Sequence, residues 1–180
     1  MKATGIVRRI DDLGRVVIPK EIRRTMRIRE GDPLEIYTDK DGEVIFKKYS
    51  PMGELSSFAA QICETLHKTS GYPVAVTDRD LVIASAGTPR RELADRRVGE
   101  ELERIMESRQ LYVYKQGDRK LNVSDGADKY FIELAAPIIA EGDVSGCVLF
   151  VAADEPHTLG DTEIKLAQTV AGFLGKQMET

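Results

Sequence analysis

Arginine and lysine side chains are concentrated in the first thirty residues, between short runs of β-branched residues. Guanidinium groups make bidentate contacts with phosphates and with guanine edges, and they remain charged at physiological pH. Residues 1–29 contain nine basic and three acidic side chains, a net charge of +6, whereas the rest of the chain contains 17 basic and 27 acidic ones, a net charge of −10. This asymmetry predicts that the N-terminal segment meets a polyanion and that the acidic body does not.

Two short strands, a helix and a hairpin are the elements that must position these cations. Gly14 can adopt the positive φ of a turn, and Pro19 suits the first turn of a helix because its missing N–H would have no partner there. Asp41-Gly42 is a typical hairpin turn between two alternating apolar segments, which predicts a half-buried sheet. The expected elements are strands at 3–10 and 15–18, a helix at 20–26, and hairpin strands at 34–37 and 44–48.

Residues 1–50 form a unit that is too small to stand alone. A segment of about fifty residues without a disulfide or a metal rarely buries enough apolar surface to be stable. Pairing with a second copy would enlarge the core and would also place two arginine clusters side by side. We therefore expect the N-terminal unit to be a homodimer.

The N-terminal segment resembles the AbrB family of swapped-hairpin DNA-binding domains. The resemblance lies in Thr4-Gly-Ile-Val-Arg8, Leu13-Gly-Arg-Val-Val-Ile-Pro19, Glu21-Ile-Arg-Arg24 and Gly31-Asp-Pro-Leu-Glu-Ile-Tyr37. It implies that two chains interlace their hairpins into one β-barrel dimer that binds double-stranded DNA. The arginines that match those facing DNA in the family are Arg8, Arg15, Arg23 and Arg24. Charge alone adds Lys2, Arg9 and Lys20.

The remaining residues show the pattern of an α+β domain. Apolar residues recur with helical spacing between Leu55 and Leu66 and again between Ile164 and Met178, and Thr158 and Asp161 have the spacing of a capping box. Short apolar runs between these helices predict a mainly antiparallel sheet with flanking helices. We expect residues 51–53 to be a linker and residues 54–180 to form this second domain.

Residues 54–180 resemble the GAF family of sensory domains. The resemblance lies in Leu134-Ala-Ala-Pro-Ile-Ile139, in residues 142–151 and in the helix of residues 158–178. This part of the sequence has no obvious cyclic-nucleotide signature and no clear chromophore cysteine. It implies a domain that either holds an unidentified small molecule around residues 85–130 or only oligomerises. Pairing of the helices at 54–68 and 161–178 would convert a dimer into a homotetramer.

The order of the two domains resembles that of the stage V sporulation protein T regulators. This resemblance implies a transcription factor of spore-forming bacteria, acting as activator and repressor in the forespore. We expect a cytoplasmic protein without catalytic residues, cofactor or metal, because the chain has no apolar signal region or membrane-length apolar run and its two histidines and two cysteines form no catalytic or metal-binding motif. The alternative is an antitoxin-type DNA-binding protein whose C-terminal region binds a partner protein.

Overall fold

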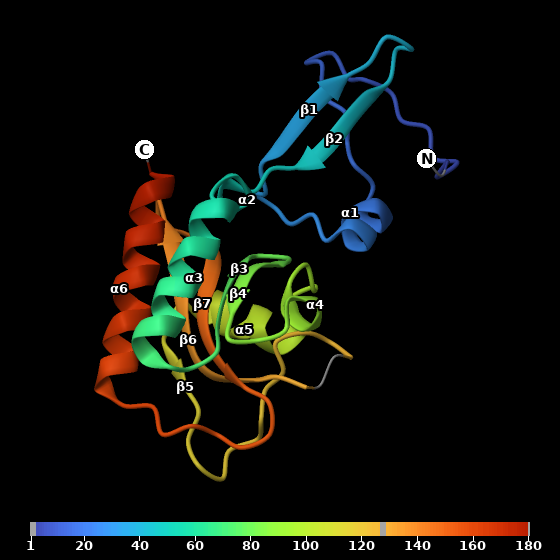
Figure 1. The fold of residues 1–180 in the computed structure, drawn as a ribbon. Coiled ribbons are helices and arrows are strands. Elements are labelled where there is room, and N and C mark those ends of the chain that lie inside the picture. The colour runs from blue at the N-terminus through green and yellow to red at the C-terminus, as the bar shows by residue number, and fades with distance from the viewer. Residues whose placement is uncertain (1–2, 127–128, 180) are drawn as a thin grey trace. The chain divides into compact units, whose positions relative to one another are not determined.

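The computed structural model describes residues 3–126 and 129–179. The chain divides into two compact units, residues 1–49 and residues 50–180. Figure 1 shows a hairpin and a short helix in the first unit, and a sheet covered by helices in the second. Each unit is considered separately below.

The first unit contains the predicted helix and the predicted hairpin. Helix α1 spans Lys20–Met26, and strands β1 and β2 span Leu34–Thr38 and Val44–Lys48. The two strands pair antiparallel, with Ile36 opposite Phe46. The helix prediction and the hairpin prediction are therefore confirmed.

The strands predicted at residues 3–10 and 15–18 do not form within this chain. The turn between them does form, because the Gly14 N–H donates to the Asp11 carbonyl (3.0 Å) and the Asp11 N–H donates to the Arg15 carbonyl (3.0 Å). A strand requires a hydrogen-bonded neighbour along its length. The described part of the chain supplies none beyond this turn, so it contains no closed barrel.

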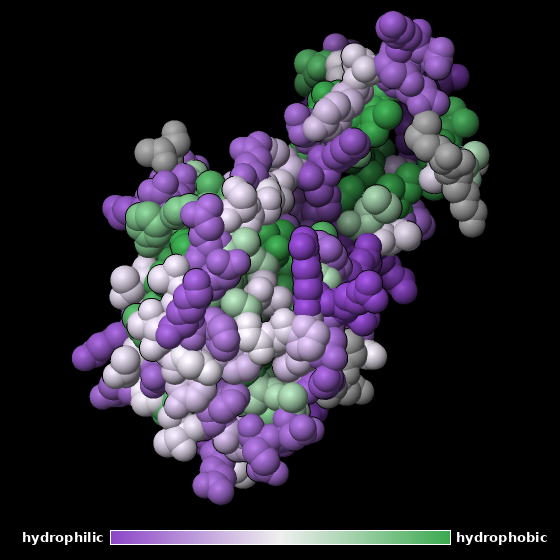
Figure 2. All heavy atoms as spheres, viewed as in Figure 1, coloured by the Kyte–Doolittle hydropathy of each residue, from purple (hydrophilic) through white to green (hydrophobic). Residues whose placement is uncertain are grey.

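Apolar side chains of the first unit remain exposed, contrary to the prediction of a half-buried sheet. Val7 is 87% exposed, Val17 70% and Ile36 60%. Among residues 3–49 only Pro19 is buried. The hairpin has no second layer within its unit, and Figure 2 shows the resulting apolar surface in green among the charged side chains.

A five-stranded antiparallel sheet forms the centre of the second unit. The strand order is β4-β3-β7-β6-β5. The longest pair, β6 and β7, is joined by a tight turn that pairs Ala140 with Asp143. The strands are β3 (Val74–Asp78), β4 (Val82–Ala86), β5 (Tyr112–Val113), β6 (Phe131–Ala140) and β7 (Asp143–Ala152).

Helices cover both faces of this sheet, as Figure 1 shows. One core lies under α3 and α6 and contains Phe150 and Leu174, and the other lies under α4 and α5 and contains Leu102 and Leu149. The helices are α2 (Pro51–Glu54), α3 (Ser56–Ser70), α4 (Arg90–Leu93), α5 (Glu100–Ser108) and α6 (Asp161–Met178). The predicted α+β layer architecture is confirmed.

The segment expected as a linker, residues 51–53, lies inside α2. Ser50 is its N-cap and accepts a hydrogen bond from the Gly53 N–H (3.1 Å). Met52 is fully buried in the core beneath α3. Apolar burial therefore secures the first turn of the second unit to the sheet domain.

Candidate nucleic-acid interface

The predicted DNA-contacting side chains lie on three separate stretches of the first unit. Arg8 and Arg9 belong to the extended N-terminal segment, Arg15 follows the first turn, and α1 carries the remaining cations, Lys20, Arg23 and Arg24. All six are exposed. Lys2 lies outside the described residues. One copy therefore presents these cations in three separate groups.

Asp11 holds Arg15 in place. One carboxylate oxygen of Asp11 accepts hydrogen bonds from the backbone N–H groups of Leu13 (3.0 Å) and Arg15 (2.8 Å), and the other accepts from Arg15 Nε (2.8 Å). The Arg15 backbone N–H, followed by the Arg15 guanidinium, keeps the pKa of Asp11 below its ordinary value. Arg15 is thus oriented although its side chain is 69% exposed.

The C-terminal end of α1 is closed by backbone hydrogen bonds. Arg27 has a left-handed conformation (φ 52°), its N–H donates to the Arg24 carbonyl (3.3 Å), and the Ile28 N–H donates to the Arg23 carbonyl (2.8 Å). This is a Schellman motif with arginine in the position that usually holds glycine. It ends the helix directly after the turn that carries Arg23 and Arg24.

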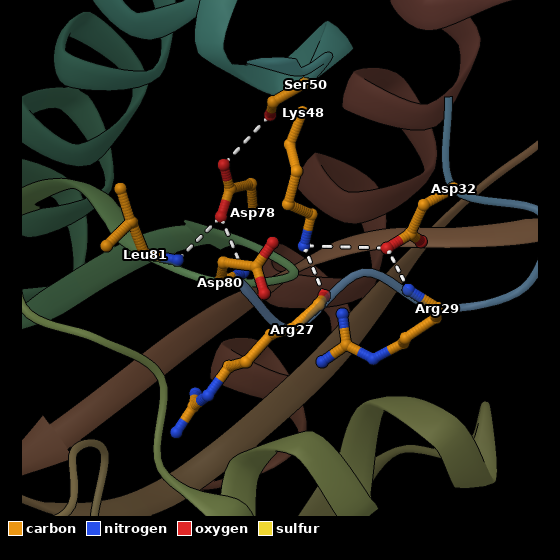
Figure 3. Close-up of polar contacts among 8 residues, drawn as sticks. All are labelled: Arg27, Arg29, Asp32, Lys48, Ser50, Asp78, Asp80 and Leu81. Carbon is orange, nitrogen blue, oxygen red and sulfur yellow. Dashed lines mark hydrogen bonds and ion pairs between the residues drawn. The ribbon is translucent and has the colours of Figure 1, made fainter. Parts of the chain in front are cut away.

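Lys48 ties this helix end to the hairpin, as Figure 3 shows. Its Nζ donates to the Arg27 carbonyl (2.9 Å) and lies 3.5 Å from Asp32 Oδ2. The same Asp32 oxygen accepts the Arg29 N–H (2.8 Å). Because a seven-residue helix is marginal on its own, this link positions the α1 arginines. Sequence reasoning missed Lys48, since only the fold brings the end of β2 to the end of α1.

A second polar cluster in Figure 3 belongs to the start of the sheet unit. Asp78, only 8% exposed, accepts from the N–H groups of Asp80 (2.7 Å) and Leu81 (2.6 Å) with one oxygen. Its other oxygen accepts from Ser50 Oγ (2.9 Å). The first residue of this unit is therefore fastened to the turn between β3 and β4.

The sheet unit carries no metal-binding cluster among its described residues. Its two cysteines are buried, and burial raises the pKa of both thiols, that of Cys63 to about 12. They therefore act as small hydrophobic residues. No helix in the described ranges is long and apolar enough to cross a bilayer.

The sheet unit also has a groove that overlaps only in part with the region where a ligand is expected. The sequence predicts that a ligand, if one is held, lies around residues 85–130, where α4 and α5 pack onto the sheet. The groove, of about 270 Å³, lies between β6 and α6, and Arg109 and Leu111 of the expected region are among its lining residues. Its lining is apolar except for Arg109 and Gln168. This groove is open and lies next to the exposed side of α6, which makes it a surface feature and not an enclosed ligand cavity.

Comparison of the sequence with protein families finds two matches. Residues 54–179 match the family described as "Stage V sporulation protein T C-terminal, transcription factor". Residues 7–53 match the family described as "Antidote-toxin recognition MazE, bacterial antitoxin". The two matched segments correspond closely to the two structural units.

Curated relatives include two regulators of Bacillus subtilis (strain 168). Stage V sporulation protein T is 49% identical over 180 residues, which cover 99% of both chains. The transition state regulatory protein AbrB is 65% identical over 51 residues, which cover 28% of this chain and 52% of AbrB. The first similarity extends over both units and the second is confined to the basic one.

Solved structures show that the sheet unit has the GAF fold. The PixJ GAF domain of Thermosynechococcus elongatus superposes with a TM-score of 0.57 at 15% identity, covering 73% of this chain and 89% of that domain. The GAF domain of the nutrient sensor CodY from Clostridium difficile gives 0.50 at 12% identity, covering 66% and 83%. At such low identity the likeness concerns the fold alone.

Proposed function

The chain belongs to the stage V sporulation protein T family of transcription factors, and on this premise we propose that it regulates sporulation genes, as activator and repressor, by binding double-stranded DNA through paired N-terminal units. The observation that carries the proposal is the combination in residues 1–49 of exposed arginines with apolar side chains that the unit cannot bury. The first feature fits a polyanion, and the second fits another copy of the same segment.

Pairing of two N-terminal units explains the extended segments at residues 3–10 and 15–18. These segments have the β-branched composition of strands and lack a partner along the described chain. Strands of a second copy would complete their hydrogen bonding and cover Ile36 and Phe46, which are 60% and 44% exposed. The same pairing would double the set of arginines presented to DNA.

Helix α1 is too short to act as the long recognition helix of a helix-turn-helix protein. It has seven residues and carries its arginines in its last turn. Arginines on short elements and extended segments suit contacts with phosphates and with isolated guanine edges. We infer that operator selection relies in part on DNA shape and deformability.

The sheet unit provides a second surface for association. Phe58 of α3 and Phe173 of α6 lie with ring centroids 5.7 Å apart, and Phe173 is 46% exposed. Ile62 and Val170 are also only partly buried on these neighbouring helices. We infer that α3 and α6 pair with the same helices of another copy, giving a tetramer whose two DNA-binding dimers are linked.

We propose that the GAF-like unit serves oligomerisation or small-molecule sensing and has no catalytic role. On the basis of its family membership, we propose that the protein acts in the forespore cytoplasm. The match of residues 7–53 to an antitoxin family supports the antitoxin alternative only for the DNA-binding unit. Toxin-binding segments are short and extended, whereas residues 50–180 form a sheet covered by helices on both faces.

Single replacements Arg8→Ala, Arg15→Ala, Arg23→Ala and Arg24→Ala test the proposal. Each is expected to weaken duplex binding and to flatten the salt dependence by about one unit per phosphate contact removed. Lys40→Ala, in the exposed hairpin turn, removes the same charge and is the matched control. Binding is measured by fluorescence anisotropy over a salt series. Unchanged affinity and slope in all four arginine variants would refute the assignment.

A further inference from the structure

A short segment of the acidic sheet unit is rich in arginine. Residues 50–180 carry 14 basic and 21 acidic side chains, yet four of those basic ones fall within the eight positions from Arg90 to Arg97. They are Arg90, Arg91, Arg96 and Arg97, and all four are exposed. A cluster of exposed guanidinium groups on an otherwise acidic body requires a functional explanation.

The backbone of this segment is held rigidly against the edge of the sheet. Leu93 and Val98 are 2% and 1% exposed and anchor it in the core under α4 and α5. Between these anchors the Val82 N–H donates to the Arg96 carbonyl (2.9 Å), and Leu81 forms an antiparallel bridge with Arg97. Arg96 and Arg97 therefore project from backbone that is bonded to the sheet edge, and Arg90 and Arg91 project from α4, which ends at the buried Leu93.

No carboxylate in the described part of the chain pairs with these four arginines. One of the two acids within the segment, Glu92, is occupied elsewhere: it accepts from Lys129 Nζ (2.7 Å) and from the Tyr130 hydroxyl (2.6 Å). The Lys129 and Tyr130 hydrogen bonds lower the pKa of Glu92. Asp95, the other acid between the two arginine pairs, is exposed. The segment thus keeps an excess of positive charge available to a partner.

We propose that the arginine segment, residues 90–97, is a second DNA-contacting surface that binds phosphates of the duplex held by the N-terminal units. Guanidinium groups without internal partners fit phosphate oxygens. DNA is the favoured polyanion because the sheet unit begins at the residue that follows the N-terminal unit, so a duplex bound there is present at high effective concentration. The inference rests on the proposed function, and it revises the expectation that the acidic body avoids polyanions.

The test compares two double variants of the full-length protein. Arg96→Ala/Arg97→Ala removes two charges from the segment, and Arg104→Ala/Lys115→Ala removes two exposed charges from α5 and from the segment after β5. Binding is measured from 50 to 200 mM salt on a duplex extending beyond the minimal bound length. If both arginines contact phosphate, the change in affinity across this range shrinks by about tenfold, since each contact accounts for roughly threefold. The control should retain the wild-type slope.

A second pair, Arg90→Ala/Arg91→Ala, keeps the test informative should the first variant unfold. Light scattering and thermal melting verify assembly and fold for each protein. The inference would be overturned if both double arginine variants fold and keep the wild-type salt dependence of DNA affinity. It would also be overturned if the control variant loses as much salt dependence as they do. Failure of the second surface is distinguished from failure of the proposed function by the variants of Arg8, Arg15, Arg23 and Arg24. If these variants lose DNA binding while both double arginine variants retain it, only the second surface is refuted. If those four variants bind normally, the proposed function itself fails.

Discussion

At the scale of single residues, the contact between Asp11 and Arg15 shows how an acid can support a polyanion-binding site. Asp11 accepts three hydrogen bonds from Leu13 and Arg15 and shapes the turn that precedes the second extended segment. The sequence suggests the turn, because Asp and Gly are typical turn residues. It does not indicate the ion pair, which depends on the direction of the Arg15 side chain.

This role leads to a prediction that opposes simple charge counting. Asp11→Ala should weaken DNA binding, by about threefold, because an exposed but well-aligned ion pair is lost and Arg15 is freed to move. Asp12→Ala is the matched control, since the Asp12 carboxylate accepts no hydrogen bond in the described part of the chain; it should leave binding unchanged or slightly tighter. Anisotropy titrations at one salt concentration decide between them. Equal tightening in both variants would show that Asp11 acts only through its charge.

Protonation should have the same consequence as the Asp11 replacement. The pKa of Asp11 in the folded chain lies below its ordinary value of 3.8. The ion pair is therefore complete above that value and is lost only as the pH falls through the lower, folded pKa. If DNA binding weakens already at a pH above the ordinary pKa of Asp11, the weakening must come from the protonation of other groups.

At the scale of elements, α6 shows what a helical pattern can and cannot predict. Its apolar spacing predicts the helix, but the expected capping box of Thr158 and Asp161 is wrong. The helix begins at Asp161 after Gly160, whose N–H donates to Glu163 Oε2 (2.8 Å). Glutamate, which reaches back to the N-cap N–H better than aspartate, takes the role two positions later.

Two glycines of α6 have opposite predicted effects on stability. A Cβ at Gly175 would lie 2.2 Å from the Ile139 carbonyl oxygen of β6, whereas a Cβ at Gly172 would meet no atom within 4 Å. Gly175→Ala should lower the free energy of unfolding by about 2 kcal/mol because the helix must move off the sheet. Gly172→Ala should raise it by about 0.5–1 kcal/mol through helix propensity. Chemical denaturation of both variants tests this pair, and a stable Gly175→Ala protein would contradict the close packing.

At the scale of the whole molecule, the proposed assembly uses two separate association surfaces. Phe173→Glu places a charge on the partly exposed stripe of α3 and α6 without altering residues 1–49. It should convert the tetramer into a dimer, because burying an unpaired carboxylate at a helix interface is strongly unfavourable. Gln168→Glu, on an exposed position of the same helix but five residues before Phe173 and so on a different face, controls for the added charge. Light scattering gives the mass, and an unchanged tetramer in the Phe173 variant would place the second interface elsewhere.

Local patterns in the amino-acid sequence were sufficient for much of this protein. Helical spacing, turn residues and charge predicted α1, the β1–β2 hairpin, the α+β architecture and the basic segment at residues 1–29, because each depends on neighbours a few positions apart. Contacts between distant positions required the folded chain. Lys48 reaches the end of α1 across 21 positions, and Leu81 fixes the arginine segment beside β4. The strands expected at 3–10 and 15–18 remain extended in one copy because backbone hydrogen bonding between strands is a property of pairs, which no single segment can satisfy.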